Sequence, residues 1–403
     1  MLLKNKNLNK NLKILSEKYF ELKKKEGNDF LGVLDDSGEY KKVIDILDLD
    51  KVAKELFFKK LSEKYYDVYI GSPQEIIDDF LNKLGNITED FKEAEFDKLY
   101  NSFECFLYDD YLEVTHYIHL YNYAQTLQIM LLSPQIYIRK TTINEKREEL
   151  DESHSGFIIS SYISDFVIEI KTRIKKEISS DKSLRYSNNL EEHNKIINIF
   201  DIVLNSLRVL KKSSVFLSNR NVTNISAFTS QSKITFISSN LKPIFEGDIC
   251  QITEVETEEL KSIFNFIHEN SIATAKNKDE QRLRIAITRL NDGITRDNPI
   301  DRLIDYMIGL EALFLPDGNQ ELQYRLITRI AFNLEKKFEK RKQLYKEMKE
   351  YYDERSKGVH GDSGKLKKED VNKVEEILRK SILTWKYDKS IFDSENLTYN
   401  FFR

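Results

Sequence analysis

Arg355 and His360 are the pair of residues in this chain whose types and spacing could support chemistry. They stand five positions apart in the segment 351–361, where the helical pattern of apolar residues gives way to glycine. A guanidinium is permanently charged and suits phosphate oxygens, and an imidazole can accept or release a proton near neutral pH. Because RNA carries its own nucleophile, the ribose 2′-hydroxyl, such a pair suffices in principle to cleave RNA without a metal ion.

The pattern around this pair predicts a helix that presents Arg355 on its apolar side. Tyr345, Met348 and Tyr352 recur at helical intervals, and Arg355 falls on the same stripe. An arginine aligned with apolar residues needs a partner, because burying an unpaired charge is costly. The glycines at 358 and 361 are expected to loosen or end the helix, which would leave His360 at a helix end or in the following turn, where it can be exposed.

Four blocks in order resemble the HEPN superfamily, and within it the Apea-like HEPN group, over about residues 255 to 388. The blocks are 289–292, 301–314, 324–331 and 352–361. The resemblance implies an all-α bundle that dimerises. It also implies, commonly, a metal-independent endoribonuclease of phage defence, abortive infection or toxin–antitoxin systems, which leaves room for an antitoxin or another defence-system partner.

Glu311 is a carboxylate on a stripe that otherwise faces the core. It follows a run of apolar residues at helical spacing between 300 and 308, on a helix expected to begin at Asn298-Pro299. The simpler explanation is a buried ion pair with Arg325 or Arg329, which stand four apart on the following helix. The alternative is that Glu311 positions a catalytic group or the substrate. Loss of one partner of a buried pair typically costs ~3–5 kcal/mol, so loss of function on mutation would not by itself show catalysis.

A single histidine does not easily carry out both proton transfers of RNA cleavage. If two bundles associate with their motifs facing, each composite site gains two copies of Arg355 and of His360, and a homodimer becomes part of the mechanism. The expected products are a 2′,3′-cyclic phosphate and a 5′-hydroxyl. Ser356 could hydrogen-bond the phosphate, whereas nucleases of the family often carry Asn, Asp or His there. No tyrosine closely follows His360, so the resemblance does not extend to toxins silenced by adenylylation of such a tyrosine.

Two other interpretations remain open. In the first, Arg355 pairs with Asp353, Glu354 or Glu311, and His360 only caps a helix. In the second, the bundle is a non-catalytic HEPN module that binds nucleotides or RNA, or serves as a scaffold in a defence complex.

Length and composition predict a globular protein of two or three domains. The chain has 403 residues, 40% of them hydrophobic, and a formal net charge of -4. A nucleic-acid site must therefore be local. We predict an α+β domain over 1–250, which could sense a trigger, recruit RNA or hold a dimer, and a HEPN-like helical bundle over 251–403. The chain as a whole is expected to be mainly α, and neither a Walker loop, a GxGxxG fingerprint nor a nucleophile elbow is present.

Apolar periodicity predicts the individual elements. Residues 1–26 form a basic amphipathic helix, for which packing against the body is favoured over contact with RNA or a membrane. The other expected helices are 48–66, 73–84, 190–212, 257–270, 278–292, one from 298 and 367–387. The expected strands are 30–34, 42–44, 112–118, 136–138 and 166–170, with two or three more in 214–238.

Neither a metal nor a cofactor is expected. Cys105 and Cys250 lack metal-ligand spacing, and we interpret them as buried thiols in a reducing compartment. His116 and His119 would share a face with Glu113 only in a helix, so ordinary histidines are favoured over a metal site. The first residues contain no apolar signal region, and no window approaches the ~20 apolar residues of a membrane span, so a cytoplasmic location is expected.

Overall fold

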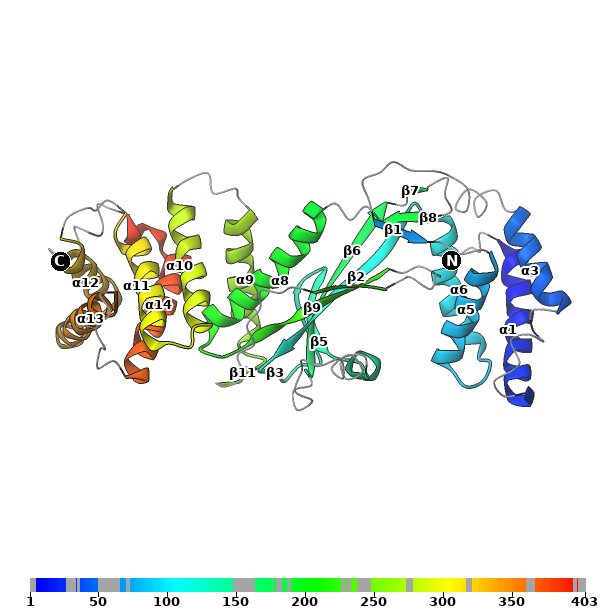
Figure 1. Cartoon of the computed structure of the whole chain (residues 1–403), viewed down its shortest axis with the longest axis horizontal. Helices are drawn as coiled ribbons and strands as arrows, with labels where there is room; N and C mark the ends of the chain where they lie inside the picture. The colour runs from blue at the N-terminus through cyan, green and yellow to red at the C-terminus, as the bar shows by residue number, and fades with distance from the viewer. Residues whose placement is uncertain are drawn as a thin grey trace. The chain divides into compact units, whose positions relative to one another are not determined.

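The computed structural model describes residues 5–26, 34, 37–49, 66–69, 73–147, 164–175, 177–178, 183–186, 190–225, 228, 233–237, 248–272, 278–316, 321–359, 367–393 and 397 (Figure 1). His360, residues 30–33 of the first predicted strand and nearly all of the predicted helix 48–66 lie outside these ranges. The chain is mainly helical, with a smaller content of strands. Within the described ranges, no helix has both the length and the apolar character needed to cross a membrane.

The chain divides into two compact units. Unit 1 comprises Met1–Ile118, Glu169–Ile196 and Arg220–Ile237, and unit 2 comprises His119–Ile168, Ile197–Asn219 and Ser238–Arg403. All helices predicted after residue 250 belong to unit 2, together with earlier segments of the chain. The division into domains 1–250 and 251–403 stays a prediction.

Among the residues of unit 1 that the structure describes, four helices turn their apolar faces to one core. They are α1 (Lys6–Glu26), α3 (Gly38–Leu49), α5 (Pro73–Ile87) and α6 (Glu93–Tyr108). On α1, Leu8, Leu12, Leu15 and Tyr19 follow one another at helical intervals and are buried. The predicted packing of this basic helix against the body of the protein is therefore confirmed.

The strand predicted at 42–44 is wrong, because these residues lie within α3. Tyr40, Val43 and Leu47 are buried at intervals of three and four, which is the helical period. The short window Lys42-Val43-Ile44 contains two β-branched residues and does not show that period. A run of this length cannot separate a helix from a strand by pattern alone.

The described strands form one larger sheet and two small ones. The six-stranded sheet has the order β10 (Lys233–Ile237), β9 (Phe216–Ile225), β2 (Tyr111–Tyr121), β6 (Phe166–Lys175), β5 (Ile136–Lys140) and β4 (Ile129–Ser133). A three-stranded antiparallel sheet joins β1 (Tyr66–Tyr69), β8 (Ser183–Tyr186) and β7 (Glu177–Ile178). β11 (Cys250–Ile252) pairs in parallel with β3 (Tyr123–Gln125). The strands predicted at 112–118, 136–138 and 166–170 are confirmed.

The C-terminal helices of unit 2 form a bundle. They are α9 (Thr257–Ile272), α10 (Lys278–Ile294), α11 (Pro299–Phe314), α12 (Leu322–Leu334), α13 (Phe338–Val359) and α14 (Lys368–Tyr387), preceded by α8 (Leu190–Leu210). Figure 1 shows α10, α11 and α14 side by side, and α12 and α13 next to each other. The predicted start of α11 is confirmed, since the side chain of Asn298 accepts a hydrogen bond from the amide of Ile300 at 2.9 Å.

One buried carboxylate joins two of these helices. Glu375 of α14 is 2% exposed and accepts hydrogen bonds from Arg302 Nη2 at 2.9 Å and from the Tyr306 hydroxyl at 3.0 Å, both on α11. Arg379, one turn further on α14, donates to the other carboxylate oxygen at 2.5 Å. Three donors thus satisfy a charge that would otherwise be costly to bury.

The same arrangement extends to α8 and α10. Arg379 Nε donates to the carbonyl oxygen of Arg208 at 2.8 Å, and Arg208 Nη1 donates to the Asn291 side chain at 3.0 Å. Arg208 also donates twice to the carbonyl oxygen of Val215. Burial lowers the pKa of Arg208 to about 10, which leaves it charged at neutral pH. Buried polar groups therefore fix four helices of the unit to one another.

Replacing Glu375 should destabilise the chain strongly. Glu375→Gln keeps the size of the side chain but removes the charge that Arg302 and Arg379 face. We expect a loss of ~3–5 kcal/mol in the free energy of unfolding, measured by urea denaturation. Glu376→Gln is the matched control, because Glu376 is the next residue and is exposed. Its expected effect is within ~0.5 kcal/mol, and an equal effect of the two variants would contradict the argument.

A glycine lets α13 approach α11 closely. A Cβ atom built on Gly358 would lie 2.3 Å from Ile300 Cγ2, a separation that real side chains do not adopt. The glycine predicted to loosen the helix therefore lies inside α13, which continues to Val359. At this position the absence of a side chain serves the packing of two helices.

Gly358→Ala should therefore destabilise the bundle, by ~1–3 kcal/mol in urea unfolding, through overpacking. The control is Gly38→Ala, because a Cβ at Gly38 would meet nothing within 4 Å. In an Ile300→Ala background, which removes the obstructing methyl group, the cost of Gly358→Ala should shrink. An unchanged cost in that background would rule out the steric explanation.

Candidate functional site

The last turns of α13 bring together three residues that the sequence singled out. The Arg355 guanidinium nitrogen Nη2 lies 3.8 Å from Oε1 of Glu311 on α11, and both side chains are about one-quarter exposed, at 24% and 23%. The guanidinium carbon of Arg355 lies 5.6 Å from the ring centre of Tyr352. Met348 and Tyr351, on the same side of α13, are buried. The predicted apolar stripe thus positions Arg355 at the edge of the core.

Electrostatics at this site are set by partial burial. Burial raises the pKa of Glu311, while the charge of Arg355 and a hydrogen bond with the Tyr352 side chain oppose that rise. Burial also raises the pKa of Tyr352, and the carboxylate of Glu311 raises it further. No local sequence pattern predicts the contact between Tyr352 and Glu311, because these residues lie on different helices.

The guanidinium of Arg355 retains unused capacity to donate hydrogen bonds. Its Nε atom is buried and has no hydrogen-bond partner among the residues that the structure describes. Its ion pair at 3.8 Å is longer than a charge-assisted hydrogen bond of ~2.7–2.9 Å. An anion with several oxygens, such as a phosphodiester, could therefore gain contacts here that the protein does not supply.

The two arginines of α12 differ in their surroundings from Arg355. Arg329 is 3% exposed and donates from Nη1 to the carbonyl oxygen of Phe314 at 2.7 Å, at the end of α11. This bond satisfies a carbonyl that the helix itself leaves unpaired. Arg325 lies one turn earlier on α12 and is half-buried. Glu311, for which an ion pair with one of these residues was favoured, lies within ion-pair distance of Arg355 instead.

The neighbours of Arg355 along α13 have other contacts. Glu354 pairs with Lys357 at 2.6 Å, and Asp353 accepts a hydrogen bond from the Gln323 side chain at 2.7 Å. Ser356 is half-buried directly after Arg355. His360 immediately follows the last residue of α13 in sequence and lies outside the described residues. Of the three carboxylates weighed as partners of Arg355, Glu311 is the one whose contact with it is described.

The histidines of β2 belong to the interior of the fold. His116 and His119 lie on a strand, which places them on opposite faces. The ring nitrogens of His116 lie 2.9 Å from the hydroxyl of Thr223 and 3.1 Å from that of Thr172, and both histidines are buried. These histidines were expected at the surface or half-buried, and both are buried instead, with the ring nitrogens of His116 hydrogen-bonded to the two threonines.

The two cysteines are free thiols. Cys250 is buried, as predicted, and burial raises its pKa to about 11, which keeps the sulfur protonated and unreactive. Cys105 is half-buried and contributes to the lining of a pocket in unit 1.

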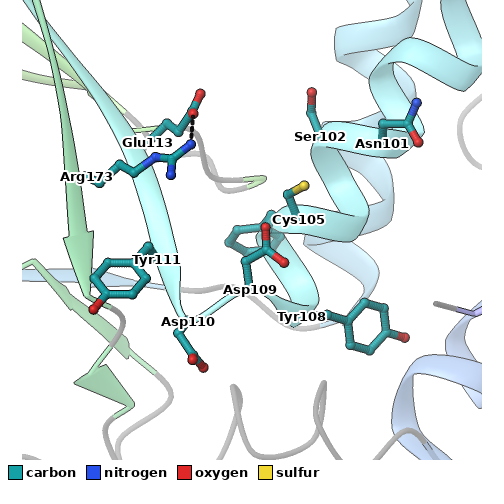
Figure 2. Close-up of a pocket in the computed structure, with 10 residues that line it drawn as sticks. Asn101, Ser102, Cys105, Tyr108, Asp109, Asp110, Tyr111, Glu113 and Arg173 are labelled. Carbon is teal, nitrogen blue, oxygen red and sulfur yellow. Dashed lines mark hydrogen bonds and ion pairs between the residues drawn. The ribbon is translucent and has the colours of Figure 1, made fainter. Parts of the chain in front are cut away.

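That pocket, of about 570 Å³, lies where α6 ends and β2 begins (Figure 2). Its lining includes the carboxylates of Asp109, Asp110 and Glu113 and one cation, Arg173, whose Nη2 is 3.2 Å from Glu113. Figure 2 shows this ion pair on the strand side, across from Cys105 on α6. Three carboxylates against one paired arginine disfavour a phosphate ligand. The pocket is therefore less suited to nucleic acid than the surroundings of Arg355.

Comparison of the chain with family models, with curated proteins and with solved structures gave no match. The chemistry of the site follows from its residues: a half-buried cation with an unpartnered Nε, a phenol and a small hydroxyl side chain in the last turns of α13, and a carboxylate from α11. Such a set can bind and orient a phosphate group.

The ionisation of Glu311 should make stability depend on pH with a definite sign. Because burial raises its pKa, the folded chain binds a proton here more readily than the unfolded chain. The folded state therefore loses stability from this group as pH rises from the ordinary value of ~4.3 through the raised one. Glu311→Gln lacks this effect, so urea unfolding over a pH series should show the variant gaining relative to the wild type across that interval.

Arg355→Ala provides the control for this measurement. Without the guanidinium charge, which lowers the pKa of Glu311, the pH-dependent loss of stability should extend to higher pH than in the wild type. A relative gain of the wild type over Glu311→Gln with rising pH would show that the ion pair outweighs burial.

Proposed function

We propose that the chain is a metal-independent endoribonuclease of the HEPN type, in which Arg355 and His360 act on the phosphodiester. Helices α9 to α14 would serve as the HEPN-like bundle. The observation that carries the proposal is Arg355 itself: it is half-buried at the end of α13, has a buried Nε without a partner, and precedes a histidine by five positions. The sequence blocks that resemble the HEPN superfamily support the same conclusion.

Cleavage in this proposal needs one base, one acid and positive charge. An imidazole of His360 accepts the proton of the ribose 2′-hydroxyl, whose oxygen attacks phosphorus as the bond to the 5′-oxygen breaks. The leaving 5′-oxygen takes a proton from a second imidazole, which gives a 2′,3′-cyclic phosphate and a 5′-hydroxyl. Arg355 stabilises the negative charge that develops on the phosphate oxygens, and Ser356 offers a hydrogen bond. Glu311 and Tyr352 hold the guanidinium in place.

The need for two imidazoles is why the proposal includes a homodimer. Two copies of the bundle would place two copies of His360 at one composite site. An enzyme that cleaves cellular RNA is toxic, which fits an effector of phage defence, abortive infection or a toxin system. A neutralising partner would then keep it inactive until a trigger arrives.

One observation favours the alternative, a non-catalytic module that binds nucleotides or RNA in a defence complex. The ion pair between Arg355 and Glu311 partly satisfies the guanidinium without any substrate. In that case the arginine would contribute to binding or to packing, and His360 would have no role in proton transfer.

Loss of either proposed catalytic group should abolish RNA cleavage. His360→Ala and Arg355→Ala are each expected to lower the rate ~10²–10⁴-fold, the usual contribution of a positioned proton donor or charge stabiliser. The assay is purified protein with total RNA in excess chelator, followed by mapping of the cut ends and their phosphates. The matched control is Lys357→Ala, because Lys357 is an exposed cation on the same turn.

The same variants separate the two functions in cells. Expression of the wild type and of Lys357→Ala should arrest growth, while the Arg355 and His360 variants, folded and of the same oligomeric state, should not. Equal toxicity of all four proteins, or cleavage that stops when chelator is added, would remove the metal-independent nuclease from consideration.

A further inference from the structure

The first half of α13 and the turn before it form a strongly basic surface. Residues 336–349 contain seven Lys or Arg residues against two Glu, in a chain whose net charge is -4. The exposed lysines among them are Lys336, Lys337, Lys340, Lys342, Lys346 and Lys349. None of these six forms an ion pair within the part of the chain that the structure describes. The surface therefore has positive charge that the described fold leaves unneutralised.

Some carboxylates of α13 interact with groups other than these six lysines. Glu347 accepts a hydrogen bond from the Gln343 side chain at 3.0 Å and lies 3.9 Å from Lys373 of α14. Glu354 pairs with Lys357. Glu339 and Glu350 are exposed carboxylates on the same helix. Asp353 accepts a hydrogen bond from the Gln323 side chain at 2.7 Å. Over residues 336–349, seven Lys or Arg against two Glu leave the charge positive.

Arg341 differs from the lysines because it serves the fold. Its guanidinium lies 4.2 Å from the ring centre of Phe332 and donates to the carbonyl oxygens of Glu335 and Lys336 at 3.1 and 3.3 Å. These contacts satisfy carbonyl oxygens of the turn that follows α12. The six lysines make no comparable contacts in the described structure. Arg341 is therefore a structural cation, and the lysines are not.

Three of the lysines lie in a row on one face of α13, the helix that carries Arg355 near its other end. Lys342, Lys346 and Lys349 are spaced four and three apart, so they share one face of the helix, and Asp353 and Ser356, four and seven residues after Lys349, continue that face. Tyr345 and Tyr352, also seven apart and half-buried, lie along the adjacent line. From Lys342 to Arg355 the helix rises by about 20 Å.

We propose that this row, Lys342, Lys346 and Lys349 with Tyr345 and Tyr352, binds the backbone of single-stranded RNA and directs it to Arg355. Lysines along one line can follow successive phosphates, and tyrosine rings beside them can stack on bases. The role of the row in delivering a substrate rests on the nuclease function proposed above. Binding of RNA by the row does not.

The structure favours RNA over a membrane surface as the occupant. A basic helix that lies on a membrane inserts an apolar face between the lipids. The apolar face of α13, with Met348 and Tyr351, is already buried in the bundle. What α13 offers to a partner is charge with aromatic edges, which matches a phosphate backbone with exposed bases.

The test measures binding without cleavage. The probe is a fluorescein-labelled oligouridylate with 2′-O-methyl groups, which lacks the nucleophile, and its anisotropy is followed with the full chain over a series of salt concentrations. The variant Lys342→Gln/Lys346→Gln/Lys349→Gln is compared with Lys25→Gln/Lys41→Gln/Lys42→Gln, three exposed lysines of α1 and α3. Both variants change surface residues only, and circular dichroism checks that they fold.

We expect the row variant to bind at least about tenfold more weakly at low salt and to lower the slope of log affinity against log salt by about 2, as loss of three phosphate contacts would. The control variant should match the wild type. Equal binding by the row variant, no binding by the wild type, or stronger binding of the wild type to phosphatidylserine vesicles than to RNA would overturn the proposal.

Cleavage assays with unmodified RNA separate this proposal from the nuclease function. A row variant with a raised KM and an unchanged kcat supports both. Row-dependent binding without any cleavage by the wild type would leave the RNA-binding row standing and remove the nuclease. Cleavage by the wild type with an unchanged KM in the row variant would leave the nuclease standing and remove the RNA-binding row.

Discussion

Burial of one carboxylate, Glu375, sets the geometry on which the rest of the bundle depends. A charge that is 2% exposed is tolerated only when several donors converge on it, and here α11 supplies two of them and α14 the third. That requirement fixes the rotation of α11, because Arg302 and Tyr306 must both face α14. Glu311 lies further along the same helix, five residues after Tyr306, and its direction follows from that rotation.

The position of α13 then follows from two contacts with α11. Near the start of α11, Ile300 meets Gly358 so closely that no side chain fits between them. Near its end, Glu311 faces Arg355. Two contacts at separate points of one helix restrict both the place and the rotation of the other. The core thus determines the orientation of α13 up to its last residue, Val359. His360 is the next residue in the sequence.

The sequence was sufficient for features encoded locally. The apolar spacing, with Asn298 and Pro299 at the start, correctly predicted the beginning of α11, because capping and periodicity act within a few residues. It was insufficient where short windows are ambiguous, as at 42–44, and where partners come from distant segments. The pairing of Glu311 with Arg355 joins residues far apart in sequence, and the pocket beside Asp109 draws on α6, β2 and β6. Within the blocks that resemble the HEPN superfamily, Arg289 and Arg302 each meet a buried carboxylate, so part of that pattern reflects packing.

The contrast among arginines in unit 2 is the strongest physical argument for a site at Arg355. Arg208, Arg329 and Arg379 each donate to a carbonyl or carboxylate oxygen at 2.9 Å or less, and Arg302 does so to Glu375 although its own Nε is buried without a partner. Each of these structural cations is therefore held by at least one short hydrogen bond. Arg355 has a carboxylate at 3.8 Å and a buried, unpartnered Nε, at the end of a helix whose first half carries free lysines. A cation held in place but not saturated is what binding of a phosphate requires, because the ligand must supply the missing acceptors.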